Sequence, residues 1–153
     1  MIDVDHFNVF NDTYGHELGD MVLSKLGHFL QQHVREEDIP CRYGGEEIFI
    51  IMPGSSLDNT YNRAEQLRKG IEELIVKRNN ESHTVTVSLG VANFPQHGLT
   101  AKQIIKAADL ALYKAKDQGR NQVVVAPVSA PISVPISAPA KQEVATIMTK
   151  QDS

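Results

Sequence analysis

The chain has very little cysteine and no tryptophan, with one Cys and no Trp among its 153 residues. A lone Cys41 excludes an internal disulfide, and no basic stretch followed by an apolar run opens the sequence as an export signal would. The longest uninterrupted apolar run, residues 48–52, is far shorter than the roughly 20 residues that cross a bilayer. We therefore expect a cytoplasmic protein without a membrane segment.

An excess of basic charge is also missing. The 15 Lys and Arg residues are outnumbered by 19 Asp and Glu residues, for a formal net charge of -4. No overall basic field is available to attract nucleic acid, so nucleic acid is not an expected partner. The sequence has neither a Walker loop nor a Gly-x-Gly-x-x-Gly motif, and its His residues do not fall at zinc-site spacing with Cys41.

Composition divides the chain into two parts. Residues 1–126 have the apolar content of one globular domain, long enough to bury a core. From Pro127 to Pro139 every fourth residue is proline, which removes amide donors and fixes φ. We therefore expect residues 127–153 to form an extended or disordered tail.

Hydrophobic patterning within residues 1–126 predicts an α+β fold, an α/β sandwich with helices packed on one mixed sheet. The Gly pair at 44–45 indicates a β-hairpin, which excludes a purely parallel sheet. Residues 5–19 are polar and turn-rich, with at most one or two helical turns. The expected elements are strand 1–4, a helix from 20 to 34, hairpin strands 39–43 and 48–52, helix 57–78, strand 84–92, a helix from the capping box at 100–103 to Gly119, and strand 123–125.

Two acidic clusters stand where such a sheet usually presents ligands. Asp3 and Asp5 share one face at the end of the first strand, and two carboxylates there suit Mg²⁺. A helix N-cap or a solvated turn explains the same pair. Glu46 and Glu47 follow the glycines of the hairpin and point to opposite faces, so one of them is positioned to meet Asp3, although an ordinary turn with solubilising acids would look the same.

A basic pair lies at the end of the last long helix. Lys116 and Arg120 are four residues apart and share one helical face, where they are suited to grip one polyanion. Cations at a helix C-terminus also complement the helix dipole without any ligand. Together with the acidic clusters, the pair matches the needs of phosphoryl chemistry, which relies on metal ions and cations around the phosphates.

Several motifs in order resemble one known family, the GGDEF domain of diguanylate cyclases, over residues 1 to about 126. They are Asp3-Val4-Asp5-His6-Phe7, Asn11-Asp12-Thr13-Tyr14-Gly15-His16, Gly19-Asp20, Arg42-Tyr43-Gly44-Gly45-Glu46-Glu47-Ile48, Ser88-Leu89-Gly90-Val91, and Ala108-Asp109-Leu110-Ala111-Leu112-Tyr113-Lys114-Ala115-Lys116 with Gly119-Arg120-Asn121.

The resemblance implies a palm-like fold similar to nucleotidyl cyclases, and Mg²⁺-dependent condensation of two GTP molecules into cyclic di-GMP with release of pyrophosphate; Mn²⁺ is an alternative metal. It implies that Asp3, Glu46 and the Val4 carbonyl hold the metal and that Glu47 assists attack by the 3′-hydroxyl. The other implied substrate contacts are Asn11 and Asp20 for guanine, the amides of His6 and Phe7 with Lys116 and Arg120 for phosphate, and the hairpin glycines Gly44 and Gly45.

The resemblance further implies a homodimer for turnover, because each domain binds one GTP, and product inhibition through an Arg-x-x-Asp site at Arg35 and Asp38. Family domains usually begin some 30 to 40 residues earlier, so we expect a domain that lacks its first helix and the start of its first strand. Asn8 stands where the family usually has Lys, and Ile48 where its signature closes on Phe.

Two alternatives remain open at the level of sequence. The first is a catalytically inactive domain that binds GTP or cyclic di-GMP, and the second is a structural or interaction domain without a nucleotide. Intact Glu46 and Glu47 favour the cyclase over the inactive binding domain, whereas the missing start of the domain favours lost activity.

Overall fold

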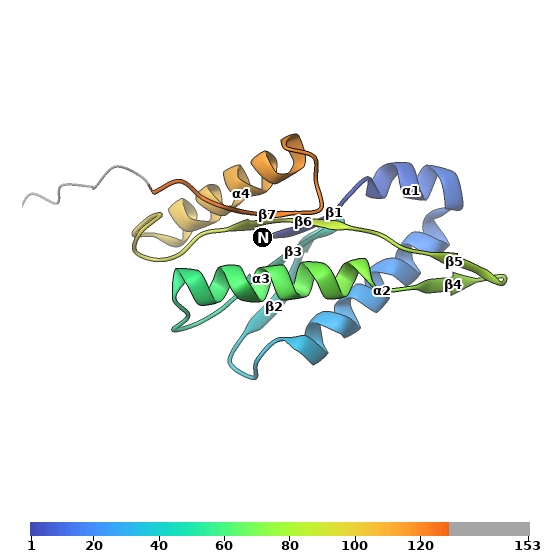
Figure 1. Ribbon diagram of the computed structural model, residues 1–153, viewed down its shortest axis with the longest axis horizontal. Coiled ribbons are helices and arrows are strands. Elements are labelled where there is room, and N and C mark those ends of the chain that lie inside the picture. Colours follow the sequence, from blue (N-terminus) through green and yellow to red (C-terminus); the bar gives the residue numbers. More distant parts are fainter. Residues whose placement is uncertain (129–153) are drawn as a thin grey trace, which may run out of the picture.

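A mixed five-stranded sheet in the order β2-β3-β1-β6-β7 forms the centre of the molecule (Figure 1). The structure is a computed structural model and describes residues 1–128, so the expected tail lies outside the described residues apart from its first two positions. β6 and β7 pair in parallel and the other neighbours are antiparallel, which confirms the mixed sheet. The strands are β1 (Ile2–Val4), β2 (Ile39–Gly44), β3 (Glu47–Ile51), β6 (Val87–Val91) and β7 (Val123–Val125).

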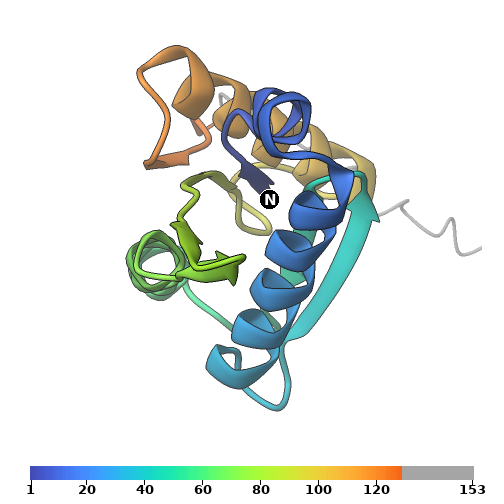
Figure 2. The same ribbon diagram turned by 90° about the vertical axis from the view of Figure 1, so that its right-hand side faces the viewer.

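Helices cover both faces of this sheet. α4 (Ala101–Asp117) lies on one face, and α2 (His16–His33) and α3 (Leu57–Glu72) lie on the other (Figures 1 and 2). The short α1 (Phe7–Tyr14) follows β1 directly and lies on the same side as the C-terminal end of α4 (Figure 2). The α+β class expected from the sequence is therefore confirmed.

Side-chain spacing explains how the layers pack. Val22, Leu26 and Leu30 recur at helical spacing along α2 and are buried against the sheet residues Ile2 and Val4. On the opposite face, β6 approaches α4 so closely that a Cβ added to Gly90 would lie 2.1 Å from the Ala108 carbonyl oxygen. The expected capping box at Thr100 and Gln103 is present and starts α4.

The structure corrects three expectations about the helices. Residues 7–14 form a complete helix, and Gly15, with φ of 88°, separates it from α2, which begins at residue 16 and not at residue 20. α3 ends at residue 72 and not at residue 78. The apolar residues Leu74 and Ile75 extend the helical pattern beyond the point where the backbone leaves the helix.

A second, two-stranded sheet was not expected. β4 (Val76–Arg78) and β5 (Glu81–His83) pair in an antiparallel hairpin, so residue 84 no longer opens the long strand. The turn between them is Asn79-Asn80, whose φ values of 50° and 66° belong to the left-handed region that tight hairpins use. Asparagine tolerates that region, so the Asn79-Asn80 dipeptide could have indicated a hairpin from the sequence alone.

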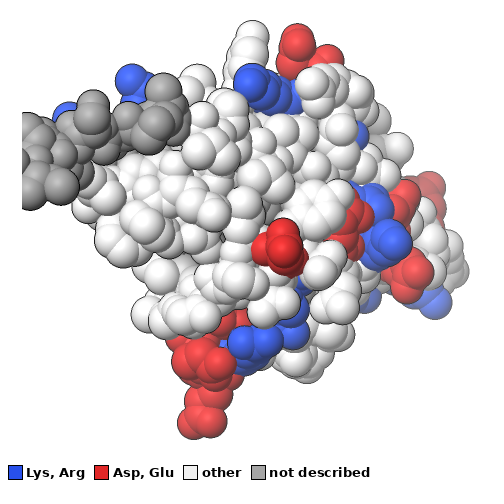
Figure 3. Space-filling view, turned by 60° about the vertical axis from the view of Figure 1, so that its left-hand side comes forward, with Lys and Arg blue, Asp and Glu red and all other residues white. Residues whose placement is uncertain are grey.

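The first strand is short, and an apolar pocket lies beyond its start. Met1 exchanges two backbone hydrogen bonds with Gly90 of β6. Next to Met1 a pocket of about 300 Å³ lies between β3 and β6, with Ala64 of α3 and Ile104 of α4 among its lining residues. The molecular face in Figure 3 is mostly uncharged in its upper left part, and its acidic and basic side chains gather below and to the right. Within residues 1–128 we find no helix that combines the length and the apolarity needed to span a bilayer.

Candidate functional site

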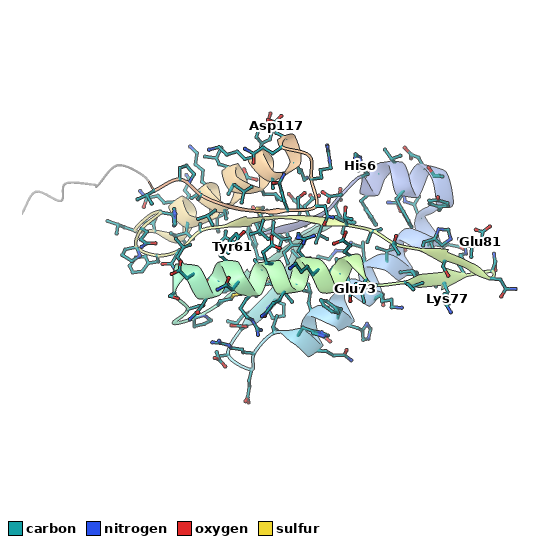
Figure 4. The ribbon with its side chains drawn as sticks, in the orientation of Figure 1. His6, Tyr61, Glu73, Lys77, Glu81 and Asp117 are labelled. Carbon is teal, nitrogen blue, oxygen red and sulfur yellow. The ribbon has the colours of Figure 1, made fainter. Side chains whose placement is uncertain are left out.

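The polar residues expected to act together meet where β1 ends. Asp3 is the cross-strand partner of Glu47 on β3 and of Ser88 on β6, so the three side chains share one face of the sheet. That face is the one covered by α4. Figure 4 shows His6, at the start of α1, and Asp117, at the end of α4, on this same side of the sheet.

Asp3 is the electrostatic centre of this cluster. Its carboxylate is buried, and its Oδ2 lies 2.8 Å from the Lys116 Nζ at the end of α4. Burial raises the pKa of Asp3 above its usual value, Lys116 opposes that shift, and Glu46 and Glu47 reinforce it. One buried carboxylate is therefore surrounded by one cation and two further carboxylates. An added cation would reduce the repulsion among these three carboxylates.

The hairpin turn brings the backbone close to this cluster. Gly45 has φ of 43°, and the pairing register shifts between Arg42 and Gly44. A Cβ added to Gly44 would meet no atom within 4 Å, so packing inside the chain does not explain the missing side chain there. The Arg42 Nε donates a hydrogen bond of 2.8 Å to the Gly45 carbonyl oxygen and holds the turn in place.

The donor set of the cluster fits a hard divalent cation. Asp3, Glu46 and the Val4 carbonyl offer only oxygen atoms, which Mg²⁺ prefers, and Mg²⁺ usually keeps one or two carboxylates and completes its shell with phosphate and water. Within residues 1–128, no three His, Cys, Asp or Glu residues converge on one point. The two carboxylates of Asp3 and Glu46 are the number that Mg²⁺ sites completed by phosphate and water usually have.

Anion-binding groups lie next to the carboxylates. His6, with φ of 56°, caps α1, and no side chain accepts a hydrogen bond from the amides of the first turn, which begins at Phe7. Free amides at a helix start favour an anion. Lys116 reaches Asp3. The expectation that Lys116 and Arg120 share one helical face is wrong, because α4 ends at Asp117 and Arg120, with φ of 63°, is exposed in the loop that follows.

The expected guanine-binding residues lie on α1 and α2. The Oδ1 of Asn11 is buried without a hydrogen-bond partner, which is costly unless a donor arrives. A Cβ added to Gly19 would lie 1.9 Å from that oxygen, so only glycine leaves room for Asn11. Asp20 is exposed and lines surface pockets beside α2.

Asp5 is a structural residue, which resolves the ambiguity of the first acidic pair. Its carboxylate is buried and accepts hydrogen bonds from Thr86 Oγ1 at 2.7 Å, Ser88 Oγ at 2.6 Å and the Asn121 amide at 3.0 Å. Three donors leave little capacity for a metal ion. Asp3 and Asp5 therefore have different environments, although both were expected on the same face of the sheet.

The expected inhibitory residues lie apart from this cluster, in the loop between α2 and β2 at the bottom of Figure 1. Asp38 is buried; its Oδ2 accepts a hydrogen bond of 3.0 Å from the Arg35 amide and lies 3.8 Å from Arg63 Nη2 of α3. The Arg35 side chain is exposed and contacts Glu37 at 3.7 Å. Asp38 thus orders the loop, and Arg35 is available to a ligand.

Some residues around these sites carried no sequence signal. Arg63 reaches the inhibitory loop, and Arg68 on the same helix bonds to the side chain of Asn121, 53 residues further along the chain. Asn121 belongs to the Gly-Arg-Asn motif. In the sequence, however, Arg63 and Arg68 are recognisable only as residues on the polar face of an amphipathic helix. Contacts over such separations follow from the tertiary fold alone.

Comparison with known proteins gives a consistent result. The family model described as diguanylate cyclase, GGDEF domain, matches residues 1–122. Diguanylate cyclase A of Treponema denticola is 38% identical over 126 residues, which cover 82% of this chain and 34% of that protein. The chain therefore spans about a third of the length of that relative.

Solved structures agree with the sequence comparison. The GGDEF domain of DgcB from Caulobacter crescentus, in complex with c-di-GMP, superposes with a TM-score of 0.75 at 34% identity and covers 81% of this chain and 74% of that one. The active GGEEF domain of a diguanylate cyclase from Vibrio cholerae superposes with a TM-score of 0.76 at 32% identity and covers 84% of this chain and 81% of that one. The mixed sheet and its flanking helices match these domain structures.

Proposed function

The chain belongs to the GGDEF family of diguanylate cyclase domains, and on that basis we propose that it condenses two GTP molecules into cyclic di-GMP. The observation that carries the proposal is the buried Asp3 carboxylate, which is paired with Lys116 and whose pKa is raised chiefly by burial and further by the nearby Glu46 and Glu47. A purely structural ion pair does not require two more carboxylates beside it, whereas a site for a metal-bound triphosphate does.

The reaction joins the two nucleotides through two equivalent displacements. The 3′-oxygen of each GTP forms a bond to the α-phosphorus of the other, and the bond from that phosphorus to the oxygen bridging to the β-phosphate breaks. Each displacement releases one pyrophosphate and one proton. Each domain holds one GTP, so two copies of the domain must face each other, and turnover depends on their encounter and orientation.

The chain's own residues bind and orient the substrate. Asn11, through its side-chain amide, and Asp20, through its exposed carboxylate, bind the guanine edge. The amides at the start of α1, with Lys116 and Arg120, hold the phosphates and offset their negative charge. Gly44 and Gly45 let the nucleotide approach the hairpin, and Glu47 accepts the proton of the attacking hydroxyl.

Asp3, Glu46 and the Val4 carbonyl would hold Mg²⁺, or Mn²⁺ in its place. When bound, the metal supplies charge neutralisation at the phosphates and lowers the pKa of the attacking hydroxyl. Lys116 stands beside Asp3 and opposes the rise that burial causes in the pKa of that carboxyl, which favours the ionised form that a metal needs.

Product inhibition forms the second half of the proposal. Arg35 presents its guanidinium in the loop that Asp38 orders, and a guanidinium fork suits guanine and phosphate edges. The DgcB domain that resembles this chain was crystallised with c-di-GMP, which supports cyclic di-GMP as the ligand. A domain that has lost turnover and only binds cyclic di-GMP here is the alternative function.

The test is detection of cyclic di-GMP by mass spectrometry after incubation of the purified protein with GTP and Mg²⁺. We expect Glu46→Gln to reduce turnover by at least about 100-fold, because it removes a metal-binding charge. Glu81→Gln makes the same chemical change on the exposed β5 strand and serves as the matched control.

Normal turnover in Glu46→Gln would remove Glu46 from the site. If the folded wild-type protein forms no product, the cyclase proposal fails. Binding of cyclic di-GMP by that same protein would then support the binding function.

A further inference from the structure

The loop after α4 has an unusual backbone. Gly119, Arg120 and Asn121 are three consecutive residues with positive φ, at 114°, 63° and 46°. Glycine adopts such values freely and asparagine tolerates them, but for arginine the left-handed region costs about 1 kcal/mol. The Arg120 amide donates a hydrogen bond of 2.9 Å to the Ala115 carbonyl oxygen of α4, and the next residue, Asn121, is held by contacts outside the loop.

Asn121 connects the loop to two other parts of the fold. Its backbone amide donates a hydrogen bond of 3.0 Å to Asp5, the saturated carboxylate two residues beyond Asp3. Its side-chain Oδ1 accepts a hydrogen bond of 2.7 Å from Arg68, and its Nδ2 donates one of 3.0 Å to Glu72. Both side-chain partners belong to α3, on the opposite face of the sheet from α4.

Arg68 is held firmly at the other end of this connection. Its side chain is only 12% exposed, with Glu65 at 3.2 Å and Glu72 at 3.0 Å. Asn121 and Arg68 together lower the pKa of Glu72, so the carboxylate stays ionised against the guanidinium. A fork of N–H groups that engages two carboxylates and an amide oxygen has a fixed orientation, unlike most surface arginines.

We propose that Arg68 is a positioning residue for the phosphates of the nucleotide. Through Asn121 it holds the loop that carries Arg120 and that directly follows the end of α4, where Lys116 lies. This inference rests on the proposed nucleotide site and adds a residue of α3 that touches neither substrate nor metal. It follows that loss of Arg68 should weaken contacts to phosphate and spare contacts to guanine.

The experiment compares two probes in the presence of Mg²⁺. One is the α,β-methylene analogue of GTP, whose α–β bridge cannot be cleaved, and the other is guanosine, which has no phosphates. We expect Arg68→Ala to weaken binding of the analogue by about tenfold and to leave guanosine binding unchanged. Lys69→Ala, on the exposed neighbouring position of α3, is the matched control.

Two further variants keep the test decisive if Arg68→Ala is poorly folded. Arg68→Lys keeps the charge without the fork, and we expect binding between that of the wild type and that of Arg68→Ala. Asn121→Gly removes the amide side chain without straining the positive φ, and we expect it to reproduce the effect of Arg68→Ala. In the double variant the two effects should not add, because both remove the same contact.

Each outcome separates this inference from the proposed function. If the wild-type protein does not bind the analogue, the nucleotide site itself is wrong and the inference falls with it. If the wild type binds but the Arg68 and Asn121 variants match it, only the inference fails. Equal weakening of guanosine and analogue would also overturn it, since that is the signature of general destabilisation.

Discussion

At the scale of single residues, two aspartates on one strand face have different chemistry. Asp5 has three hydrogen-bond donors and serves the fold, whereas Asp3 has one cation and two acidic neighbours. Keeping such a charge buried lowers the stability of the folded state, and sites of this kind are where proteins exchange stability for function.

The raised pKa of Asp3 gives a prediction about stability and pH. A carboxyl whose pKa is higher in the folded state stabilises the fold while it is protonated, and this contribution is lost as the pH rises through the raised pKa. We expect Asp3→Asn to melt at a higher temperature than the wild type at pH 7 in metal-free buffer. As the pH falls through the raised pKa of Asp3, the difference in melting temperature between the variant and the wild type should disappear.

Thermal melting of both proteins, from pH 7 down to pH values below the raised pKa of Asp3, checks the prediction. Asp109→Asn, on the exposed face of α4, controls for the loss of one negative charge. A lower melting temperature for Asp3→Asn at pH 7 would mean that the ion pair with Lys116 outweighs burial and like-charge repulsion.

At the scale of elements, α2 uses glycine for two different reasons. A Cβ at Gly19 would collide with the Asn11 side chain of α1, while a Cβ at Gly27 would meet nothing within 4 Å. The first glycine permits the contact between α1 and α2 at Asn11, which we propose binds guanine. The second only lowers helix stability.

We predict opposite results for alanine at these two positions. In Gly19→Ala the Asn11 amide must rotate away, so guanosine binding should fall by about tenfold or more while stability changes little, because the gain in helix propensity offsets the strain. Gly27→Ala should stabilise the protein by up to about 1 kcal/mol and leave binding intact. Calorimetric titration with guanosine and chemical denaturation measure both effects, and unchanged guanosine binding in Gly19→Ala would separate Asn11 from guanine recognition.

At the scale of the whole molecule, the two expected ligand sites lie in different places. The acidic cluster around Asp3 lies at the end of β1, and the Arg35 loop lies between α2 and β2 (Figure 1). Asp38 orders that loop and pairs with Arg63, so its removal would confound binding with folding. Among residues 1–128, Arg35 has only the exposed Glu37 as an ionic partner, and such pairs contribute between zero and about 1 kcal/mol.

Arg35→Ala is therefore the clean test of product inhibition. We expect initial rates of cyclic di-GMP formation without product to equal those of the wild type, and inhibition by added cyclic di-GMP to weaken by about tenfold or more. Glu37→Gln, two residues away and also exposed, is the control. Inhibition unchanged in Arg35→Ala would show that the loop does not bind the product.

The sequence by itself determined what depends on near neighbours in the chain. Helical spacing in α2, the capping box of α4 and the glycine pair of the central hairpin act within a few residues, so the α+β class and the mixed sheet could be predicted. The order of motifs also located the acidic clusters and the basic pair. The roles given to those residues remain predictions.

Only the tertiary structure decided which distant groups meet. Strand register places Asp3 opposite Glu47 and beside Lys116, packing decides that Asp5 is saturated, and the chain path brings Arg68 to Asn121. The end of α3 and the β4–β5 hairpin were also missed, because apolar spacing continued past the helix. Local patterns set propensities, whereas contacts over tens of residues depend on the free energy of the whole packed fold.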